Sequence, residues 1–464
     1  MQRVVILAAL PLLVIGQTIN LPEMKSFVLD NGLKVIVVEN HEQPAVLYSM
    51  MFKSGGLQDK PGKEGETELL GKLLEGGSKN YSADRLAERI DFLGARFDVE
   101  VSREYLGIEL MVLSKDRLEG LDILSDIVIN PTFPDAELEL ARKELIAEIK
   151  WVMDAPQGIA EDHLRNVVFR GERRGTVKTL NSVGSIQRDD IVGIYTWHFA
   201  PDNAVLVIVG EVQYDSIARN VQERFSDWRA KPKQPRKSNL TGVEEMKTGT
   251  GELSPLRIRL VDKPGLTQSF IALGFPSIKR DNPDYFAYLA MNHVLGGAGF
   301  ASRLMSVVRA QQGKTYGISS RFEAGVYPGP FMIRTFTQTG QTREMIELIV
   351  KVMTEMKEKG ITEEELEHVK TNQIGGYQLR FQTPSDLARE ILATELYGLG
   401  LDYLRAYPEK ISTLTIEGVN QAAAKYLDVT EFCLVVVSAA DEVEKLVEPL
   451  GAFETVPYNS LYTK

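Results

Sequence analysis

Cysteine is almost absent from this sequence: Cys433 is the only one among 464 residues. A single cysteine cannot form a disulfide within the chain, so the fold has to be held by packing, hydrogen bonds and ion pairs. A cysteine directly after the apolar N-terminal segment, the acceptor of a lipoprotein anchor, is missing as well. We therefore expect neither a disulfide scaffold nor a lipoprotein.

The chain also lacks an excess of positive charge. Lysine and arginine number 53 against 64 aspartate and glutamate residues, which gives a net charge of −11. Such a surface repels phosphate backbones and anionic membranes, so nucleic acid is not an expected partner. With 44% hydrophobic and 25% charged residues at this length, the composition indicates a soluble globular protein with at least two domains.

Long hydrophobic runs are absent except at the N-terminus. The segment from Val4 to Gly16 is unbroken and apolar, which is short for a transmembrane helix but typical of a secretory signal. We expect residues 1–16 to be a signal peptide cleaved after Gly16, and the protein to be exported to the periplasm without stable membrane insertion. If it is not cleaved, the segment serves as an N-terminal membrane anchor; a buried strand is the other alternative.

The first half of the chain predicts strands followed by helices. Asp30-Asn31-Gly32 has the turn chemistry of a tight hairpin. Farther on, apolar residues recur at helical spacing, with Ser82 as a cap candidate and Pro131 as a stop signal. The predicted strands cover 27–29, 33–38, 45–52 and 204–209, and the predicted helices cover 69–74, 82–93, 118–129 and 134–152.

The same order of elements returns in the second half, which indicates a tandem duplication. Residues 230–254 between the halves have the composition of a linker. We expect an N-terminal domain at 17–229 and a C-terminal domain at 255–464, forming hinged lobes with a shared interior face. The fold class is α+β, each domain a mostly antiparallel sheet packed with helices. In the second half, strands are predicted at 258–261, 269–274 and 433–437, and helices at 285–295, 344–356 and 363–373.

A glycine-rich stretch carries the most specific motif of the first half. It contains Ser54-Gly55-Gly56 and then, from Gly65 to Ser78, Gly-Glu-Thr-Glu-Leu-Leu-Gly-Lys-Leu-Leu-Glu-Gly-Gly-Ser. In this stretch the chain resembles the pitrilysin/insulinase family of zinc peptidases, and the likeness covers nearly all of it outside the signal segment. In that family, the glycine at position 65 precedes an inverted zinc motif, His-x-x-Glu-His, on the first helix. The resemblance implies that the two domains form half of a clamshell.

The motif positions in this chain are Glu68, Gly71 and Lys72, and the family's third ligand, a Glu on a later helix, matches Glu148. In the family, two histidines on one helix face hold zinc while a carboxylate between them deprotonates the bound water. Here the base is missing and an ammonium replaces a ligand, so we expect no tight zinc site. Lys72 is expected to form an ion pair with Glu68 or Glu148 instead. A self-sufficient peptidase would need zinc on Glu68 and Glu148 alone.

Histidines elsewhere offer no replacement site. No two of them have the spacing of ligands on one helix face, and we expect each to be a surface or core residue. We therefore expect this chain itself to bind no metal and no other cofactor. The five histidines are His41, His163, His198, His293 and His368.

The second half keeps another part of the family's machinery. Residues 292–317, with Gly-Gly-Ala-Gly-Phe-Ala-Ser-Arg-Leu at their centre, are similar to the most recognisable stretch of the family's C-terminal half. In the two-chain members, which include mitochondrial processing peptidase, one subunit supplies zinc and the other supplies an Arg and a Tyr. Arg309 and Tyr316 match that pair. A guanidinium can bind a substrate carbonyl or carboxylate, and a phenol can donate to the developing oxyanion.

The local pattern around this pair also predicts its setting. Gly313 should end the helix that carries Arg309, and Tyr316 should open a strand. Both side chains are expected to face the cavity between the lobes. Arg303 is expected to form a structural ion pair.

These features predict one subunit of a zinc endopeptidase, inactive alone. The leading hypothesis is an exported heterodimer in which a paralogous, zinc-binding subunit supplies zinc and general base. This chain then supplies Arg309 and Tyr316, and the substrate is a peptide. The alternative is a proteolytically silent scaffold or peptide-binding protein of the same fold, like the silent family members in respiratory complexes.

Overall fold

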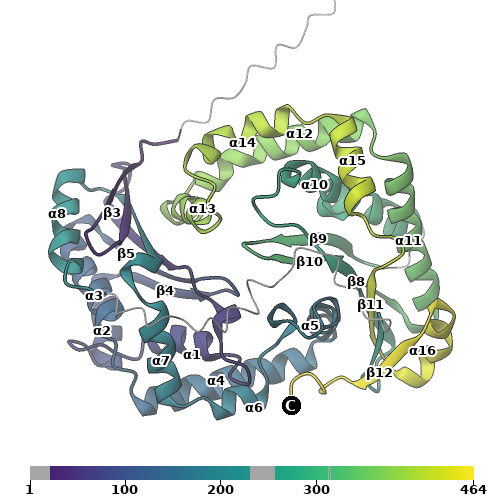
Figure 1. Cartoon of the computed structure of the whole chain (residues 1–464), viewed down its shortest axis with the longest axis horizontal. Helices are drawn as coiled ribbons and strands as arrows, with labels where there is room; N and C mark the ends of the chain where they lie inside the picture. Colours follow the sequence, from purple (N-terminus) through teal and green to yellow (C-terminus); the bar gives the residue numbers. More distant parts are fainter. Residues whose placement is uncertain (1–20, 230–256, 312, 314, 464) are drawn as a thin grey trace, which may run out of the picture.

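The computed structural model describes residues 21–229, 257–311, 313 and 315–463. The predicted signal peptide and linker lie outside these ranges, so their assignment stays a prediction. The described strands form two six-stranded sheets, one in each half of the chain (Figure 1). Their bounds are β1 Lys25–Val28, β2 Lys34–Glu39, β3 Ala45–Phe52, β4 Arg96–Val101, β5 Leu106–Leu113, β6 Ala204–Gly210, β7 Ile258–Asp262, β8 Gln268–Pro276, β9 Ile318–Ala324, β10 Pro328–Gln338, β11 Cys433–Ser438 and β12 Phe453–Pro457.

The two sheets share one topology. Their orders are β1-β2-β6-β3-β5-β4 and β12-β7-β11-β8-β10-β9, so five of the six strands correspond by position and direction. The sixth differs, because β1 runs antiparallel to β2 while β12 runs parallel to β7. In both sheets a late strand is inserted parallel to an early one, β6 beside β2 and β11 beside β7. The predicted α+β class is confirmed; the sheets are mixed, with antiparallel pairs in the majority.

Helices cover these sheets much as the apolar spacing predicts. Ser82 caps α2, since its side chain accepts a hydrogen bond from the backbone NH of Arg85. Helix α4 begins directly after Pro134 and buries the predicted leucine face. The helices are α1 Glu66–Leu73, α2 Ala83–Leu93, α3 Arg117–Ile129, α4 Asp135–Asp154, α5 Pro156–Val168, α6 Leu180–Ser185, α7 Arg188–His198, α8 Tyr214–Phe225, α10 Tyr285–Asn292, α11 Thr342–Lys359, α12 Glu363–Tyr377, α13 Pro384–Leu396, α14 Asp402–Ser412, α15 Ile416–Tyr426 and α16 Ala440–Val447.

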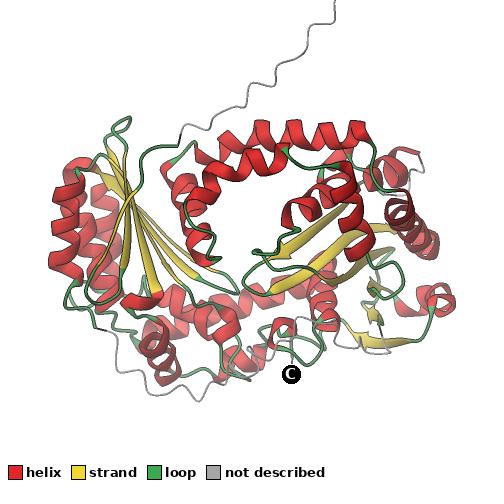
Figure 2. Ribbon diagram, turned by 45° about the horizontal axis from the view of Figure 1, so that its top comes forward, coloured by secondary structure: helices red, strands yellow, loops and turns green. Residues whose placement is uncertain are grey.

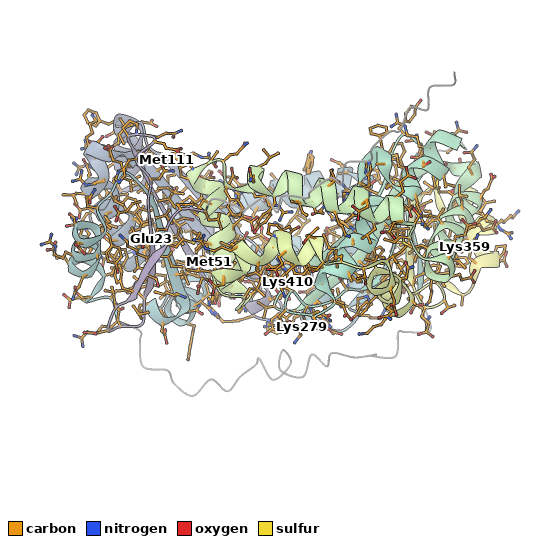
Figure 3. All side chains as sticks on the ribbon, turned by 90° about the horizontal axis from the view of Figure 1, so that it is seen from above. Glu23, Met51, Met111, Lys279, Lys359 and Lys410 are labelled. Atoms are coloured by element: carbon orange, nitrogen blue, oxygen red, sulfur yellow. The ribbon has the colours of Figure 1, made fainter. Side chains whose placement is uncertain are left out.

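The two halves exchange one helix each, which the sequence pattern did not predict. Helix α5 of the first half packs against β8 and β11 of the second sheet (Figures 1 and 2). In return, α13 of the second half packs against β3 and β6 of the first sheet, burying Leu387 and Ile391 against Val207. Met51 belongs to the same contact and lies where the first lobe meets the helices of the second (Figure 3). Each sheet therefore completes its hydrophobic packing with a helix from the other half.

Across the described parts of the chain, no helix combines the length and the apolar character needed to cross a membrane.

Candidate functional site

Helix α1 carries the positions of the degenerate zinc motif, and a buried aspartate fixes its start. Asp59 accepts hydrogen bonds from the backbone NH groups of Gly65 at 2.7 Å and Thr67 at 3.0 Å, and from the Thr67 hydroxyl at 2.5 Å. Gly65 has a φ of 106°, which favours glycine at this position. Because these bonds satisfy amides that a helix start leaves unpaired, α1 begins rigidly at this point.

An ion-pair network occupies the place where the family binds zinc. The Lys72 Nζ lies 3.0 Å from Glu148 and 3.3 Å from Glu144, which confirms the predicted pair with Glu148. Glu68 instead pairs with Lys178, whose ammonium is also 3.7 Å from Glu148. Sequence reasoning missed Lys178, because it comes from the loop before α6 and carries no motif of its own.

The residues present at this place do not fit a zinc ion. Lys72 and Lys178 are cations that direct N–H groups at the carboxylates a metal would need. A Cβ atom at Gly71 would lie 2.6 Å from Cγ2 of Val101 and 3.4 Å from Cγ1 of Val99. The side chain of a general base at position 71 would therefore require Val101 to shift. In the described part of the molecule, no three His, Cys, Asp or Glu residues gather in a way that could hold a metal.

The histidines have structural surroundings. His163 is buried on α5 beside Arg259, and burial followed by the Arg259 charge lowers its pKa to about 3. His198 shares a 2.8 Å hydrogen bond with the Ser54 hydroxyl, and His293 lies 3.3 Å from the Gln373 amide. These contacts agree with the prediction that they are surface or core residues.

The glycine-rich segment of the second half is built for close packing. A Cβ atom at Gly296 would lie 2.5 Å from the backbone nitrogen of Ser320, so the segment passes directly over β9. Arg303 forms the predicted structural ion pair, with two 2.6 Å bonds to Glu365 and one of 2.9 Å to the Gly360 carbonyl. The segment is thereby held against β9 and the start of α12.

Arg309 and Tyr316 follow this segment, Arg309 before Gly313 and Tyr316 after it. Arg309 is in a π-helical turn, Met305–Gln311, and its guanidinium carbon stacks 4.7 Å from the centre of the Phe300 ring. Tyr316 and Phe300 are 81% and 77% exposed, so both rings are open to a binding partner. Gly313 ends the turn as predicted, with a φ of 64° and its NH bonded to the Arg309 carbonyl at 3.0 Å.

The start of the strand after this pair differs from the expectation, and one neighbouring ring was missed by the sequence analysis. Strand β9 begins at Ile318, so Tyr316 precedes the strand instead of opening it. No hydrogen bond joins Arg309 to Tyr316 among the described residues. Phe300, the ring beneath Arg309, was not singled out from the sequence, although it stands in the same glycine-rich motif. That both side chains face the space between the lobes remains a prediction.

Polar contacts hold the two lobes together at their hairpin tips. Glu104, in the β4–β5 turn, accepts hydrogen bonds from the backbone NH groups of Val326 at 3.1 Å and Tyr327 at 2.9 Å in the β9–β10 turn. Glu161 of α5 pairs with Arg321 at 2.6 Å and with Arg334 at 2.7 Å. These contacts and the exchanged helices join the two lobes in this structure.

The buried Asp59 predicts a pH dependence of stability. Burial outweighs its hydrogen bonds and raises its pKa to about 7. The unfolded chain has a lower Asp pKa, so between about pH 4 and 7 the folded state holds the extra proton and stability falls as pH rises. Asp59→Asn cannot ionise, so the stability of the wild type relative to this variant should decrease over that range. Urea unfolding at several pH values measures the difference; a wild type that gains relative stability with rising pH contradicts the assignment.

The chain is similar to two models of one protein family. Residues 34–178 match the model described as Insulinase (Peptidase family M16), and residues 185–373 match the Peptidase M16 inactive domain. Among curated proteins, it is 24% identical over 417 residues to the "uncharacterized zinc protease YmxG" of Bacillus subtilis, covering 89% of this chain and 98% of that protein. It is also 24% identical over 409 residues to the "non-peptidase homolog YmxG" of Helicobacter pylori, covering 87% and 91%.

Solved structures show the same fold. A peptidase M16 inactive domain from Pseudomonas fluorescens superposes with a TM-score of 0.79 at 24% identity, over 89% of this chain and 97% of that one. The periplasmic protease PqqL from Escherichia coli superposes with a TM-score of 0.75 at 17% identity, over 89% of this chain but 45% of PqqL. The architecture of two mixed sheets with exchanged helices thus has counterparts in known structures.

Proposed function

Because the chain belongs to the insulinase family of peptidases, peptidase family M16, we propose that it is the non-zinc-binding subunit of a heterodimeric zinc metallopeptidase. The observation that carries the proposal is the contrast between its two candidate sites. Beside α1, Lys72 and Lys178 pair with Glu148 and Glu68, the carboxylates at positions that match the family's zinc ligands. In the second half, Arg309 and the exposed Tyr316 remain in the sequence context that the family uses to bind substrate.

In this proposal the chain contributes electrostatic stabilisation and substrate binding. The Arg309 guanidinium can donate paired hydrogen bonds to a substrate carbonyl or carboxylate, and the face of Phe300 orients it. The Tyr316 hydroxyl can donate to the oxyanion that forms when a peptide carbonyl is attacked. A zinc ion would be held by the partner subunit and would supply the activated water there, because the residues of this chain do not fit the metal.

The comparisons support the proposal at a coarser level. One relative is named a non-peptidase homolog, and both a family model and a solved structure carry the description of an inactive domain. We further propose that residues 1–16 direct export and are cleaved, and that the heterodimer works in the periplasm. The periplasmic location named for PqqL is compatible with this placement.

Reconstitution with a partner tests the catalytic assignment. The chain is co-expressed with paralogues that carry an intact His-x-x-Glu-His, and hydrolysis of a fluorogenic peptide is measured alongside the zinc content of the complex. Arg309→Ala and Tyr316→Phe should each lower kcat by about a hundredfold, the typical effect of removing one oxyanion donor. One zinc per heterodimer is expected.

The matched control for Arg309→Ala is Arg343→Ala, which removes an exposed arginine paired with Glu347 on α11 and should leave kcat unchanged. Full activity of both site variants in an intact heterodimer excludes the roles given to Arg309 and Tyr316.

The second candidate is a silent scaffold or peptide-binding protein. It is favoured by the ion pairs that Lys72 and Lys178 form with Glu148 and Glu68, because they leave this chain without free zinc ligands at that place. A scaffold forms stable complexes with its partner but hydrolyses no peptide in any of them. The same co-expression assay therefore separates the two functions.

A further inference from the structure

A cavity lies where the hairpin tips of the two lobes meet. Its volume is about 480 Å³, within the range of small-ligand sites. Residues 102–105 of the β4–β5 turn form one wall, and residues 323–329 around the β9–β10 turn form another. Leu57, Arg165 of α5, Arg174 and Tyr397 complete the lining. The cavity thus combines residues from both lobes and from an exchanged helix.

Arg103 is the one arginine of this lining without an acidic partner among the described residues. Its neighbours are neutralised, because Arg165 pairs with Glu323 and Arg174 pairs with Glu172 at 2.5 Å. Arg103 instead donates to backbone carbonyls, those of Arg173 and Arg174 at 3.0 Å each and that of Thr176 at 3.3 Å. A guanidinium has five N–H donors, so these three bonds leave two for a ligand.

No carboxylate of the described residues forms an ion pair with Arg103, although the charges of Glu323, Asp162 and Asp59 act on it from farther away. Burial, followed by the charge of Arg165, lowers its pKa to about 10, so it stays protonated at neutral pH. The two acids of the cavity wall are already engaged, Glu323 by Arg165 and Glu104 by the amides of the opposite turn. In a partly enclosed site, an anion that meets such a cation forms short, charge-assisted hydrogen bonds.

We propose that this cavity binds a peptide carboxylate through Arg103. The identification of the ligand as a peptide rests on the proposed function; the charge preference rests on the cavity alone. A single unpaired cation suits a singly charged carboxylate better than a phosphate. The phenol rings of Tyr105 and Tyr397 and the side chains of Leu57 and Pro328 line the same space and offer contact to neighbouring peptide atoms.

Three labelled tetrapeptides test the proposal on the chain alone. Each carries an uncharged coumarin at its N-terminus: Ala-Ala-Ala-Ala with a free C-terminus, Ala-Ala-Ala-Glu amide, and the neutral Ala-Ala-Ala-Gln amide. Fluorescence anisotropy gives Kd for each. At least one acidic peptide should bind ten- to a hundredfold more tightly than the neutral one, the typical gain of a hydrogen bond to a charged group. Which of the two binds identifies a terminal or a side-chain carboxylate.

Arg103→Gln should bring the acidic peptides down to the affinity of the neutral one, while Arg343→Gln, the surface control, should keep the difference. Arg103 also donates to backbone carbonyls within residues 173–176, so thermal unfolding first establishes that Arg103→Gln is folded. If the variant is not folded, the comparison of the three peptides on the wild type still tests the preference of the cavity for an acidic ligand. Equal binding of all three peptides, no binding of any, or a difference that survives in folded Arg103→Gln overturns the proposal.

A competition experiment makes the result specific. Inorganic phosphate should displace the acidic peptide no better than acetate at the same ionic strength; stronger displacement by phosphate overturns the assignment to a carboxylate. The assay needs no hydrolysis and no partner. A negative result here therefore leaves the test of Arg309 and Tyr316 untouched, and failure of that test leaves this one interpretable.

Discussion

Replacing Arg259 by methionine is expected to lower the free energy of unfolding by about 3 kcal/mol, at the lower end of the range for breaking a buried ion pair. Arg259 lies on β7 and is 7% exposed. It bonds Glu454 on β12 at 2.8 Å, and it reaches across to α5, where it bonds Asn166 at 2.9 Å and His163 at 3.2 Å. Its loss removes the contacts to Asn166 and His163 on α5, while Glu454 keeps Arg170 as a partner.

The control for this variant is Arg321→Gln. Arg321 also joins the second half to α5, through Glu161, but its side chain is 47% exposed, so its loss should change stability by at most about 1 kcal/mol. Urea unfolding followed by circular dichroism compares the two. Equal shifts for both variants would show that burial of the Arg259 network does not hold the exchanged helix in place.

Restoring the zinc motif is expected to fail. The triple variant Glu68→His, Gly71→Glu, Lys72→His supplies the family's ligand types, yet its new glutamate at position 71 must enter the contact with Val101 and Val99. Overpacking of this kind costs about 1 to 3 kcal/mol, and placing a carboxylate against these valines adds a desolvation penalty. We expect a loss of at least about 3 kcal/mol and less than stoichiometric zinc. Differential scanning calorimetry and metal analysis after dialysis measure the two quantities.

A fourth change separates crowding from ligand chemistry. Adding Val101→Ala removes the Cγ2 atom that meets position 71, so part of the lost stability should return. The double variant Glu68→His, Lys72→His is the matched control, because it leaves Gly71 in place and should be close to the wild type in stability. A triple variant that binds one zinc without loss of stability would show that α1 still has room for the metal.

The elements with strong local signals were predictable from the sequence. The Asp30-Asn31-Gly32 turn, the Ser82 cap and the leucine spacing of α4 each depend on neighbouring residues, so their strands and helices lie where the pattern placed them. Glu68, Gly71 and Lys72 could be identified as a lost zinc motif because residues 65–78 resemble the motif region of the zinc peptidases. Charge predicted an ion pair from Lys72 to Glu68 or Glu148, and the structure shows the pair with Glu148.

Other features depend on residues distant in sequence. Lys178, on a loop, pairs with Glu68, and Val101, on β4, lies beside Gly71. Glu323, near Arg103, pairs with Arg165. No short-range pattern encodes such contacts, because a side chain's partner is set by which elements the topology brings together.

By itself the sequence determined that the chain is a duplicated α+β protein and that its first helix had exchanged the chemistry of a zinc site for an ion pair. The first conclusion follows from side-chain type and spacing along the chain, and the second follows from the resemblance of these positions to the motif of the zinc peptidases. Only the tertiary structure decided that α5 and α13 are exchanged between the halves and that Arg103 faces a cavity shared by both lobes. The physical reason is that an apolar helix face can pack against any apolar sheet face, and the topology of the whole chain determines which sheet lies close enough.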